Sequence, residues 1–412
     1  MCKPLKILFL SNRGLLPIKD GHTRRSYNIL KGLAEKHQVY FLSFYETPEE
    51  IDIKNVKELE SFCQKVEFHP SPSKKISIPM LARLIRSLFS RDPYTIWRHY
   101  SKPFLKRVNE LITSGEFDLV HCDILPLAYA VRNKNGIFRS ITDHDVSYLK
   151  CLRICEGSRN LALKAFLRLE AWRLKKLESK IFKEVDVGIV VSELDKKILQ
   201  KLCPEGRFVV IENGVDLEKF KPTNEKVNPS TLLWLGGFDH YPNKEGMYYF
   251  LENVYPRIKH KLPDIRLDII GGGITNKLKR FACVDNSIRL LGYVNDPFPY
   301  IQKASVFIVP ILSGGGTRLK VLEAMSAGKA IVTTTIGCEG IAGENGTHYI
   351  IVNAPKDFVD AVVRIIGDPD LRNKLGDNAS QLIERKYDWK IITQKLDKIY
   401  KEILSGRTHS CS

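Results

Sequence analysis

The chain has 412 residues, with 64 Lys and Arg against 47 Asp and Glu, and a formal net charge of +17. At ~150 residues per domain this length predicts two or three domains, and 43% apolar with 27% charged residues excludes a disordered or fibrous chain. No apolar run approaches the ~18–20 residues of a membrane-spanning helix. The nine cysteines are scattered, and we expect reduced thiols in a cytoplasmic protein.

Short apolar runs alternate with helical patterns along the first ~190 residues. The apolar run near the N-terminus stops after six residues, which is too short for a signal peptide and predicts a buried first strand. Helical spacing follows at 25–34. The runs that we expect to form buried parallel strands are 7–10, 38–44, 119–121, 140–142 and 187–191.

The second half of the chain repeats this alternation. Helical patterns cover 245–262 and 315–327, and a last helix is expected from about 389 to 403. Alternating strands and helices at this spacing predict parallel sheets covered by helices, so we expect two doubly wound, Rossmann-like α/β domains over 1–200 and 201–388. The strands expected in the second domain are 231–235, 266–270, 288–291, 306–309 and 330–333.

The positive charge is concentrated in residues 71–183, which hold 22 basic and 10 acidic side chains. Two basic stretches, from Lys74 to Arg107 and from Lys150 to Lys183, interleave cations with apolar residues, and the second is predicted to form a long amphipathic helix. Three interpretations compete: a solvated helix face, attraction to an anionic membrane surface or lipid-phosphate acceptor, and nucleic-acid binding. No nucleic-acid signature accompanies the charge, so the last is disfavoured.

Three glycine-bearing stretches (19–26, 271–273 and 313–325) follow predicted strands, where parallel sheets bind ligands. None fits Walker A or G-x-G-x-x-G. In the third, Gly314, Gly315 and Gly316 precede a helix whose first turn carries Arg318 and Lys320, against the helix dipole. This arrangement predicts an anionic ligand such as a diphosphate. Glu323, further along the helix, suits a clamp on the vicinal hydroxyls of a ribose.

The stretch from Gly314 to Met325, continued to Thr334, resembles the donor-binding motif of the family-four retaining glycosyltransferases, which have the GT-B fold. Further segments of the same pattern are 211–216, 270–273, 291–294, 371–376 and 387–389. The N-terminal half matches more loosely, but 19–27 and Pro242-Asn243 resemble a branch associated with bacterial exopolysaccharide. The resemblance implies a central cleft between the domains and a helix at 389–412 that packs back on the N-terminal domain.

Two departures from the family pattern concern the donor diphosphate and sugar. The family carries Glu-x7-Glu, and Glu323 fits the second Glu while Gly315 stands where the first is expected. Phe238 stands where the family has an Arg, and Lys244 fits the accompanying Lys only approximately. Arg318, Lys320 and Arg25 are the candidates for the missing positive charge, because a diphosphate leaving group needs electrostatic stabilisation.

Polar side chains at 121–123 and 143–145 follow two short strands of the N-terminal domain. The family often has a His at such places near the transferred sugar, and His144, flanked by carboxylates, is the stronger candidate. The alternative is that His144 caps a strand end through a backbone contact. The predicted acceptor-binding residues are His121, Asp123, Asp143 and Asp145.

The resemblance implies a metal-independent, cytoplasmic transferase, peripheral on the inner face of the membrane. It would move a sugar from a nucleoside-diphosphate sugar (UDP, GDP or ADP) to a glycan or lipid-linked acceptor with retention, in cell-surface polysaccharide assembly, without a cofactor. The alternatives are a nucleotide-sugar epimerase or another Rossmann enzyme, and a catalytically silent polyanion- or membrane-binding module. The implied catalytic residues are His144, Arg318 and Lys320, and the implied donor-binding residues are Gly21, Arg25, Gly237, Lys244, Gly272, Tyr293, Val294, Gly315, Gly316, Thr317 and Glu323.

Overall fold

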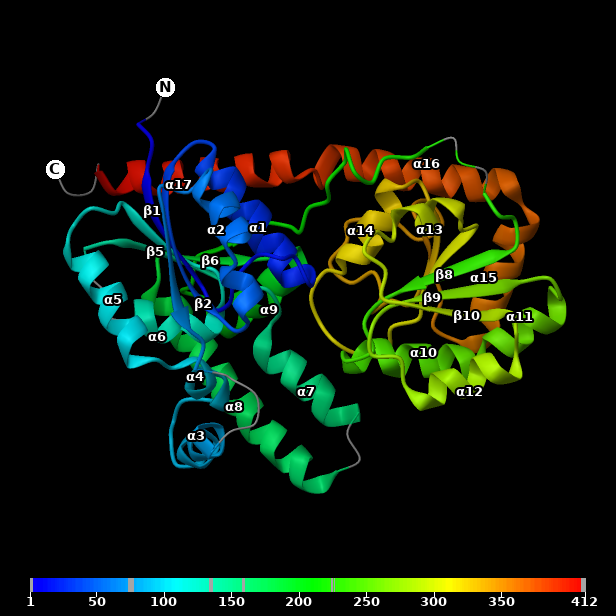
Figure 1. The fold of residues 1–412 in the computed structure, drawn as a ribbon, viewed down its shortest axis with the longest axis horizontal. Coiled ribbons are helices and arrows are strands. Elements are labelled where there is room, and N and C mark those ends of the chain that lie inside the picture. Colours follow the sequence, from blue (N-terminus) through cyan, green and yellow to red (C-terminus); the bar gives the residue numbers. More distant parts are fainter. Residues whose placement is uncertain are drawn as a thin grey trace. The chain divides into compact units, whose positions relative to one another are not determined.

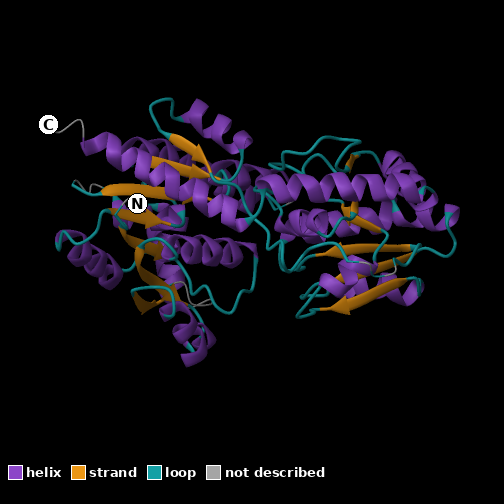
Figure 2. Cartoon of the chain, turned by 90° about the horizontal axis from the view of Figure 1, so that it is seen from above, coloured by secondary structure: helices purple, strands orange, loops and turns teal. Residues whose placement is uncertain are grey.

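The computed structural model describes residues 3–72, 78–132, 136–157, 160–223, 225 and 227–408, with no side-chain description at 78–81 or 406–408. The chain folds into two compact units (Figure 1). Unit 1 comprises residues 1–212 and 389–412, and unit 2 comprises residues 213–388. In each unit the strands lie between helices on both faces (Figure 2), which confirms the predicted α/β class.

The described residues of unit 1 form a seven-stranded parallel sheet in the order β3-β2-β1-β4-β5-β6-β7. Its interior strand β1 is buried along 7–11 and pairs with β2 and β4, which places Phe9 beside Phe41 and His121. All five predicted strands are confirmed, and β3 and β7 are additional; β3 alternates charged and apolar residues and is only half-buried. The strands are β1 (Lys6–Ser11), β2 (Gln38–Tyr45), β3 (Lys65–Pro70), β4 (Leu119–Cys122), β5 (Phe138–Asp143), β6 (Val187–Val190) and β7 (Phe208–Val210).

The boundary between the units lies after Glu212 and not after residue 200, because β7 completes the sheet of unit 1. Residues 389–412 belong to unit 1, where helix α17 crosses α1 closely: a Cβ at Gly32 would lie 2.4 Å from Cγ2 of Thr393. The helices of unit 1 are α1 (Gly21–Ala34), α2 (Ile53–Glu60), α3 (Ile78–Leu88), α4 (Tyr94–His99), α5 (Lys102–Thr113), α6 (Ala128–Val131), α7 (Ser147–Gly157), α8 (Leu161–Glu184), α9 (Glu193–Leu202), α17 (Trp389–Thr408) and the 3-10 turns Pro48–Ile51 and Leu125–Leu127.

Unit 2 contains a six-stranded parallel sheet among its described residues, in the order β10-β9-β8-β11-β12-β13. Its five predicted strands are confirmed, and β13 is a two-residue addition at one edge. The strands are β8 (Thr231–Leu235), β9 (Arg266–Ile270), β10 (Ile288–Gly292), β11 (Val306–Val309), β12 (Ala330–Thr333) and β13 (Ile350–Ile351). The helices are α10 (Tyr241–Asn253), α11 (Tyr255–Lys261), α12 (Asn276–Val284), α13 (Phe298–Lys303), α14 (Leu319–Ser326), α15 (Pro355–Gly367) and α16 (Pro369–Lys386).

Each sheet has one point where the order of its strands reverses direction. In unit 1 this point lies between β1 and β4, and in unit 2 it lies between β8 and β11. Loops that leave neighbouring strands in opposite directions open a crevice at the carboxyl edge of the sheet, and ligands of doubly wound folds bind there. These two switch points are therefore the places to search for function.

The basic stretches fold mainly as helices of unit 1. The predicted single helix at 150–183 is two, α7 and α8, and α8 buries Leu174, Leu177 and Ile181 while it exposes Trp172. Within the first basic stretch, Lys74 and Lys75 lie outside the described residues. Among the described helices, none combines the length and the apolar character that crossing a bilayer requires.

Candidate functional site

The loops after β8 and β9 in unit 2 pack backbone against backbone. The amide of Gly236 donates to the Ile270 carbonyl (2.9 Å), and the amide of Phe238 donates to the Gly272 carbonyl (2.9 Å). A Cβ at Gly271 would lie 1.9 Å from the Gly236 oxygen, so only glycine fits there. This contact fixes one side of the switch point and leaves Gly237 exposed, where an added Cβ would meet no atom within 4 Å.

The other side of the switch point is the loop from β11 to α14. Gly314 and Gly316 adopt left-handed backbone angles (φ +103° and +73°), which suit glycine and turn the chain sharply before the helix. The Thr317 carbonyl accepts from Nδ2 of Asn213 (3.1 Å), and Arg318 is the N-cap residue of α14. The helix thus begins at Leu319, later than the predicted 315, and the glycines form the loop that faces the helix N-terminus.

Lys320 lies in the first turn of α14 and points back across the loop after β8. Its Nζ donates to Oδ1 of Asn243 (3.0 Å) and lies 4.9 Å from the centre of the Trp234 ring. Burial, reinforced by the charge of Arg318, lowers the pKa of Lys320 to about 7. An anion placed at this point would raise this pKa and favour the charged amine.

Glu323 lies one turn further along α14 and is only 4% exposed. Asn243, whose Nδ2 also donates to the Gly237 carbonyl (2.9 Å), links the two sides of the switch point. Ser313 and Glu245 add a second link, with Oγ donating to Oε2 at 2.5 Å. Asn243 and Ser313 are recognised in the sequence only as parts of longer motifs, and Glu245 is not recognised, because side chains that hold two loops together leave no pattern of their own in the sequence.

The remaining predicted donor residues, and Phe238 at a departure from the family pattern, differ in their placement. Phe238, at the position of the expected Arg, is fully buried and stacks on Trp234 (4.8 Å between ring centres). A core aromatic side chain thus stands where the family has a cation. Tyr293 is 72% exposed beyond β10, and Lys244 and Val294 are half-buried. Gly315, Gly316, Thr317, Arg318 and Lys320 do gather at the switch point.

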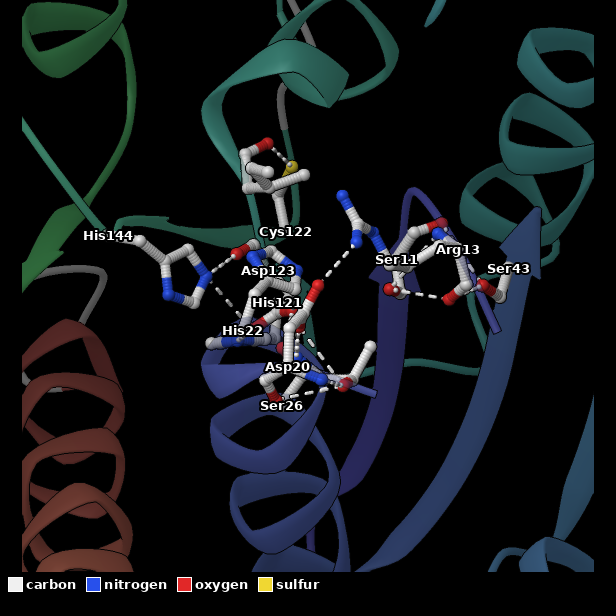
Figure 3. A network of polar contacts seen from close by, with 12 residues as sticks. Ser11, Arg13, Asp20, His22, Ser26, Ser43, His121, Cys122, Asp123 and His144 are labelled. Atoms are coloured by element: carbon white, nitrogen blue, oxygen red, sulfur yellow. Dashed lines mark hydrogen bonds and ion pairs between the residues drawn. The ribbon is translucent and has the colours of Figure 1, made fainter. Parts of the chain in front are cut away.

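The switch point of unit 1 is filled by imidazoles around one carboxylate. Asp123 follows β4 and is buried; its carboxylate accepts a short hydrogen bond from Ser26 and lies 3.7 Å from Nε2 of both His22 and His144. The two rings are 4.4 Å apart, and Nε2 of His144 donates to the Asp123 carbonyl (2.6 Å). Figure 3 shows these side chains turned toward one another.

Burial holds both of these imidazoles neutral. Burial lowers the pKa of His22 to about 3, with the charge of Arg13 next in effect, and the pKa of His144 also falls to about 3 through burial and then through His22. The ring of His144 is therefore neutral although carboxylates flank it in the sequence, because burial outweighs the charge of Asp123. His144 does make the backbone contact of the alternative interpretation, and its side chain remains 15% exposed. Sequence reasoning missed His22, which follows the N-cap Asp20 of α1.

Arg25 and His121 have interior roles that differ from those predicted. The guanidinium of Arg25 is 2% exposed and donates to the carbonyls of Ile211 (2.8 Å) and Glu212 (2.6 Å), so it is not the exposed cation expected near a diphosphate. His121 is 1% exposed, and its Nδ1 lies 2.5 Å from the hydroxyl of Tyr400 on α17. An acceptor cannot reach His121 there, so the predicted acceptor-binding role of His121 is wrong, and the residue belongs to the core of unit 1.

A buried acidic pair lies at the end of β5, where Asp143 is the last residue of the strand and Glu178 approaches it from α8. Burial raises the pKa of Glu178 on α8 to about 8, and burial together with Glu178 raises the pKa of Asp143 well above its ordinary value. Oε1 of Glu178 accepts from the amide of Ser147 (2.7 Å) and so holds the loop that carries His144. Asp143 was predicted to bind an acceptor, but it is buried, and its Oδ1 accepts from the Ser147 hydroxyl (3.4 Å), so it helps to hold the same loop. Asp145 is half-buried and pairs with Lys150 (2.6 Å).

One group among the described residues has a spacing that suits a metal ion. His22, Asp123 and His144 each offer one ligand atom, and these atoms lie within 4.8 Å of one another. Two imidazoles and a carboxylate are ligands that several transition metals accept. The hydrogen bond from Nε2 of His144 to the Asp123 carbonyl competes with such a role, because a ligating nitrogen must give up its proton.

Comparisons with known proteins follow the division into two units. Residues 19–219 match a family model described as Glycosyltransferase Family 4, and residues 229–368 match one described as Glycosyl transferases group 1. The chain is 24% identical over 379 residues to a 44.6 kDa protein in the cps region of Klebsiella pneumoniae, covering 89% of this chain and 91% of that one. It is 25% identical over 360 residues to a phosphatidyl-myo-inositol mannosyltransferase of Mycobacterium leprae, covering 82% and 85%.

A solved structure shares the whole fold. Anabaena HepE, in complex with UDP-glucose, superposes with a TM-score of 0.68 at 15% sequence identity, over 97% of this chain and 100% of that one. At this identity the likeness concerns the fold, which is GT-B. The two family models together span most of the chain. The chain therefore belongs to the family 4 glycosyltransferases and has their GT-B fold.

Proposed function

We propose that this glycosyltransferase takes its sugar from a nucleoside-diphosphate sugar that binds at the switch point of unit 2. The observation that carries the proposal is the loop Gly314–Gly316 before α14, with Arg318 and Lys320 in the cap and first turn of the helix. Two cations at a helix N-terminus oppose the dipole unless an anion binds between them. The diphosphate supplies that anion, and buried Glu323 binds the ribose hydroxyls.

The proposed acceptor is a glycan or lipid-linked sugar of a cell-surface polysaccharide, and the sugar is transferred with retention and without a metal. The names of the relatives support this class: one protein lies in a cps region, one is a phosphatidylinositol mannosyltransferase, and HepE was solved with UDP-glucose. In unit 1, Nδ1 of His144 would accept a hydrogen bond from a hydroxyl of the transferred sugar or of the acceptor, because the one proton of the neutral ring is on Nε2 and is donated to the Asp123 carbonyl. Its neutral imidazole favours this hydrogen bond over a role as a charged acid.

A thermal-shift screen of UDP, GDP and ADP, alone and with their sugars, tests the donor site, because a ligand of the native state raises the melting temperature. We expect one nucleotide to stabilise the wild-type chain, and Arg318→Ala and Glu323→Ala to remove that shift. Arg257→Ala, an exposed change on α11, is the matched control and should keep it. Unchanged nucleotide binding in the two site variants would contradict the assignment.

Product analysis tests the chemistry. We expect a product whose anomeric configuration, read by NMR coupling constants, equals that of the donor, and turnover that survives EDTA. Loss of activity with EDTA and rescue by a divalent cation would instead assign a metal to His22, Asp123 and His144. Incubation with nucleotide sugars and no acceptor separates the alternatives, because net epimerisation or a nicotinamide absorbance change would contradict a transferase.

The enzyme is proposed to be cytoplasmic and peripheral on the inner face of the membrane, where its basic stretches meet anionic lipid. Exposed lysines of α8 line a groove of about 560 Å³ beside Trp172 and Leu202. Some of these lysines pair with carboxylates, as Lys183 does with Glu205 (3.1 Å), which is the pattern of a solvated face. Binding to vesicles should rise with anionic lipid and fall with salt; equal binding to neutral vesicles would refute the electrostatic role.

A further inference from the structure

A pocket of about 410 Å³ lies among α3, α4 and the start of α5 in unit 1, apart from the switch point. Three cations line it: Arg83 and Arg86 from α3, and Lys102 from α5. No carboxylate is among its described lining residues, which otherwise are Pro72, Ala82, Trp97, Tyr100, Ser101 and Pro103. The pocket therefore concentrates positive charge.

The cations of this pocket differ from their basic neighbours in lacking partners of opposite charge. Within the described part of the chain, Arg83, Arg86 and Lys102 form no ion pair, whereas Arg107 pairs with Glu67 at 2.9 Å and Arg173 with Glu170 at 3.3 Å. Arg86 stacks over Trp97 (4.7 Å from the ring centre), and Arg83 donates to the Pro72 carbonyl. Like charges gathered and held in place repel one another unless an anion joins them.

The same helix presents apolar side chains to solvent. Ile85 and Leu88 are about half exposed, and Phe89, directly after the helix end, is 89% exposed. Ile85 and Leu88, three residues apart, share one side of α3, and Phe89 follows Leu88 directly after the helix end. We call these three exposed side chains the apolar strip. Exposed large apolar side chains beside cations are typical of segments that lie at a membrane interface.

We propose that this pocket binds the phosphate of an amphiphilic acceptor. The hydrocarbon chain of the acceptor lies along Ile85, Leu88 and Phe89 at the membrane interface. The ligand class is a long-chain lipid phosphate or diphosphate, held by guanidinium groups that suit phosphate oxygens. This inference rests on the proposed transferase function and narrows its acceptor to the lipid-linked kind. It differs from general attraction of α8 to the membrane, because it needs both a pocket and an apolar strip.

The test compares two double variants that remove the same charge. Arg83→Gln/Arg86→Gln changes the pocket, and Lys175→Gln/Lys176→Gln changes α8, where Lys176 likewise stacks on a Trp ring (3.7 Å). Each is measured by co-sedimentation with phosphatidylcholine vesicles that contain either a long-chain isoprenyl phosphate or phosphatidylserine. We expect the pocket variant to lose at least about tenfold in affinity for the isoprenyl phosphate vesicles, and the α8 variant to lose less than about twofold.

Two further measurements test the apolar strip and the source of the phosphate. Phe89→Ser should also weaken binding to isoprenyl phosphate vesicles, and inorganic phosphate should not compete, because it lacks the chain. Equal losses in the two double variants, or full competition by inorganic phosphate, would overturn the proposal. A nucleotide thermal shift in each variant shows that the variant is folded. The same measurement separates the two proposals, because absence of nucleotide binding by the wild-type chain would contradict the donor site and not the lipid-phosphate pocket.

Discussion

The two sheets of this enzyme share a topology, but their switch points are built from different materials. In unit 2 the loops at this point are largely glycine backbone, and the cations Arg318 and Lys320 lie there with the carboxylates of Glu245 and Glu323, of which Glu323 is buried. In unit 1 the equivalent place is packed with side chains, where Ser26, His22 and His144 surround Asp123. One switch point offers amides and positive charge, and the other offers neutral imidazoles.

This difference indicates a division of chemical labour. A glycine-lined crevice with cations suits a ligand that brings its own negative charge, such as a diphosphate. A buried carboxylate with uncharged imidazoles would repel that ligand but can orient hydroxyl groups through hydrogen bonds. The same backbone frame thus serves two kinds of ligand, because side chains at the strand ends determine the chemistry and the sheet determines only the place.

The largest effects should separate binding from turnover. Arg318→Ala removes a charge-assisted contact to the diphosphate and should weaken donor binding by about 10–100-fold. His144→Ala should leave donor affinity within about threefold and lower turnover by about 100-fold, because a hydrogen bond to the reacting groups counts most in the transition state. Calorimetry and initial rates measure the two quantities. Equal loss of donor affinity in both variants would remove the division of labour.

A second comparison concerns glycine in unit 2. A Cβ at Gly246 would lie 2.3 Å from the Pro310 carbonyl, so Gly246→Ala should push α10 from the loop after β11 and cost about 1–3 kcal/mol of stability. Gly237→Ala adds the same methyl group into open space and is the matched control. Thermal unfolding measures both. If the two variants unfold at the same temperature, the close approach of Gly246 to Pro310 does not determine the stability of this part of unit 2.

A third prediction concerns the acidic pair that holds the histidine loop of unit 1. The pKa of Glu178 is raised to about 8, so between about pH 4 and 8 the folded state binds more protons than the unfolded state. Stability should therefore fall as pH rises through this window, by up to about 1 kcal/mol per pH unit. Glu178→Gln keeps an acceptor for the Ser147 amide and should flatten this fall, measured by urea unfolding at several pH values. Asp264→Asn, at an exposed turn, is the control and should leave the slope unchanged.

Most of the fold was predictable because its signals are local. Buried parallel strands read as apolar runs, as 306–309 and 330–333 do, and the glycines before α14 mark a ligand loop directly. The edge strands were missed because β3 is half-buried and β7 and β13 are only two or three residues long. The boundary between the units lies later than predicted because β7 belongs to the sheet of unit 1, and this membership depends on long-range strand pairing.

The site in unit 1 was harder to predict for a physical reason. His121 and Arg25 look like cleft residues in the sequence, but tertiary contacts with Tyr400 and with the Ile211 carbonyl bury them. His144 was identified correctly as a polar residue at a strand end, yet its charge state depends on burial, which spacing alone does not reveal. His22 approaches Asp123 from α1, whereas Asp123 follows β4, and no sequence pattern joins the two.

The smallest expected effect is a proton taken up at the crevice of unit 2. Because the pKa of Lys320 is about 7, its amine is largely neutral at about pH 8, and a diphosphate beside it favours the charged form. Donor binding should then take up a fraction of a proton, and affinity should fall as pH rises above about 7. Calorimetry in buffers of different ionisation enthalpy measures the uptake, with a nucleoside-diphosphate sugar as ligand, since its diphosphate does not titrate there. Lys320→Arg keeps the charge at every pH, so it should bind without uptake; the same uptake in this variant would assign the proton elsewhere, and the comparison of a charged with an uncharged switch point would lose its electrostatic basis.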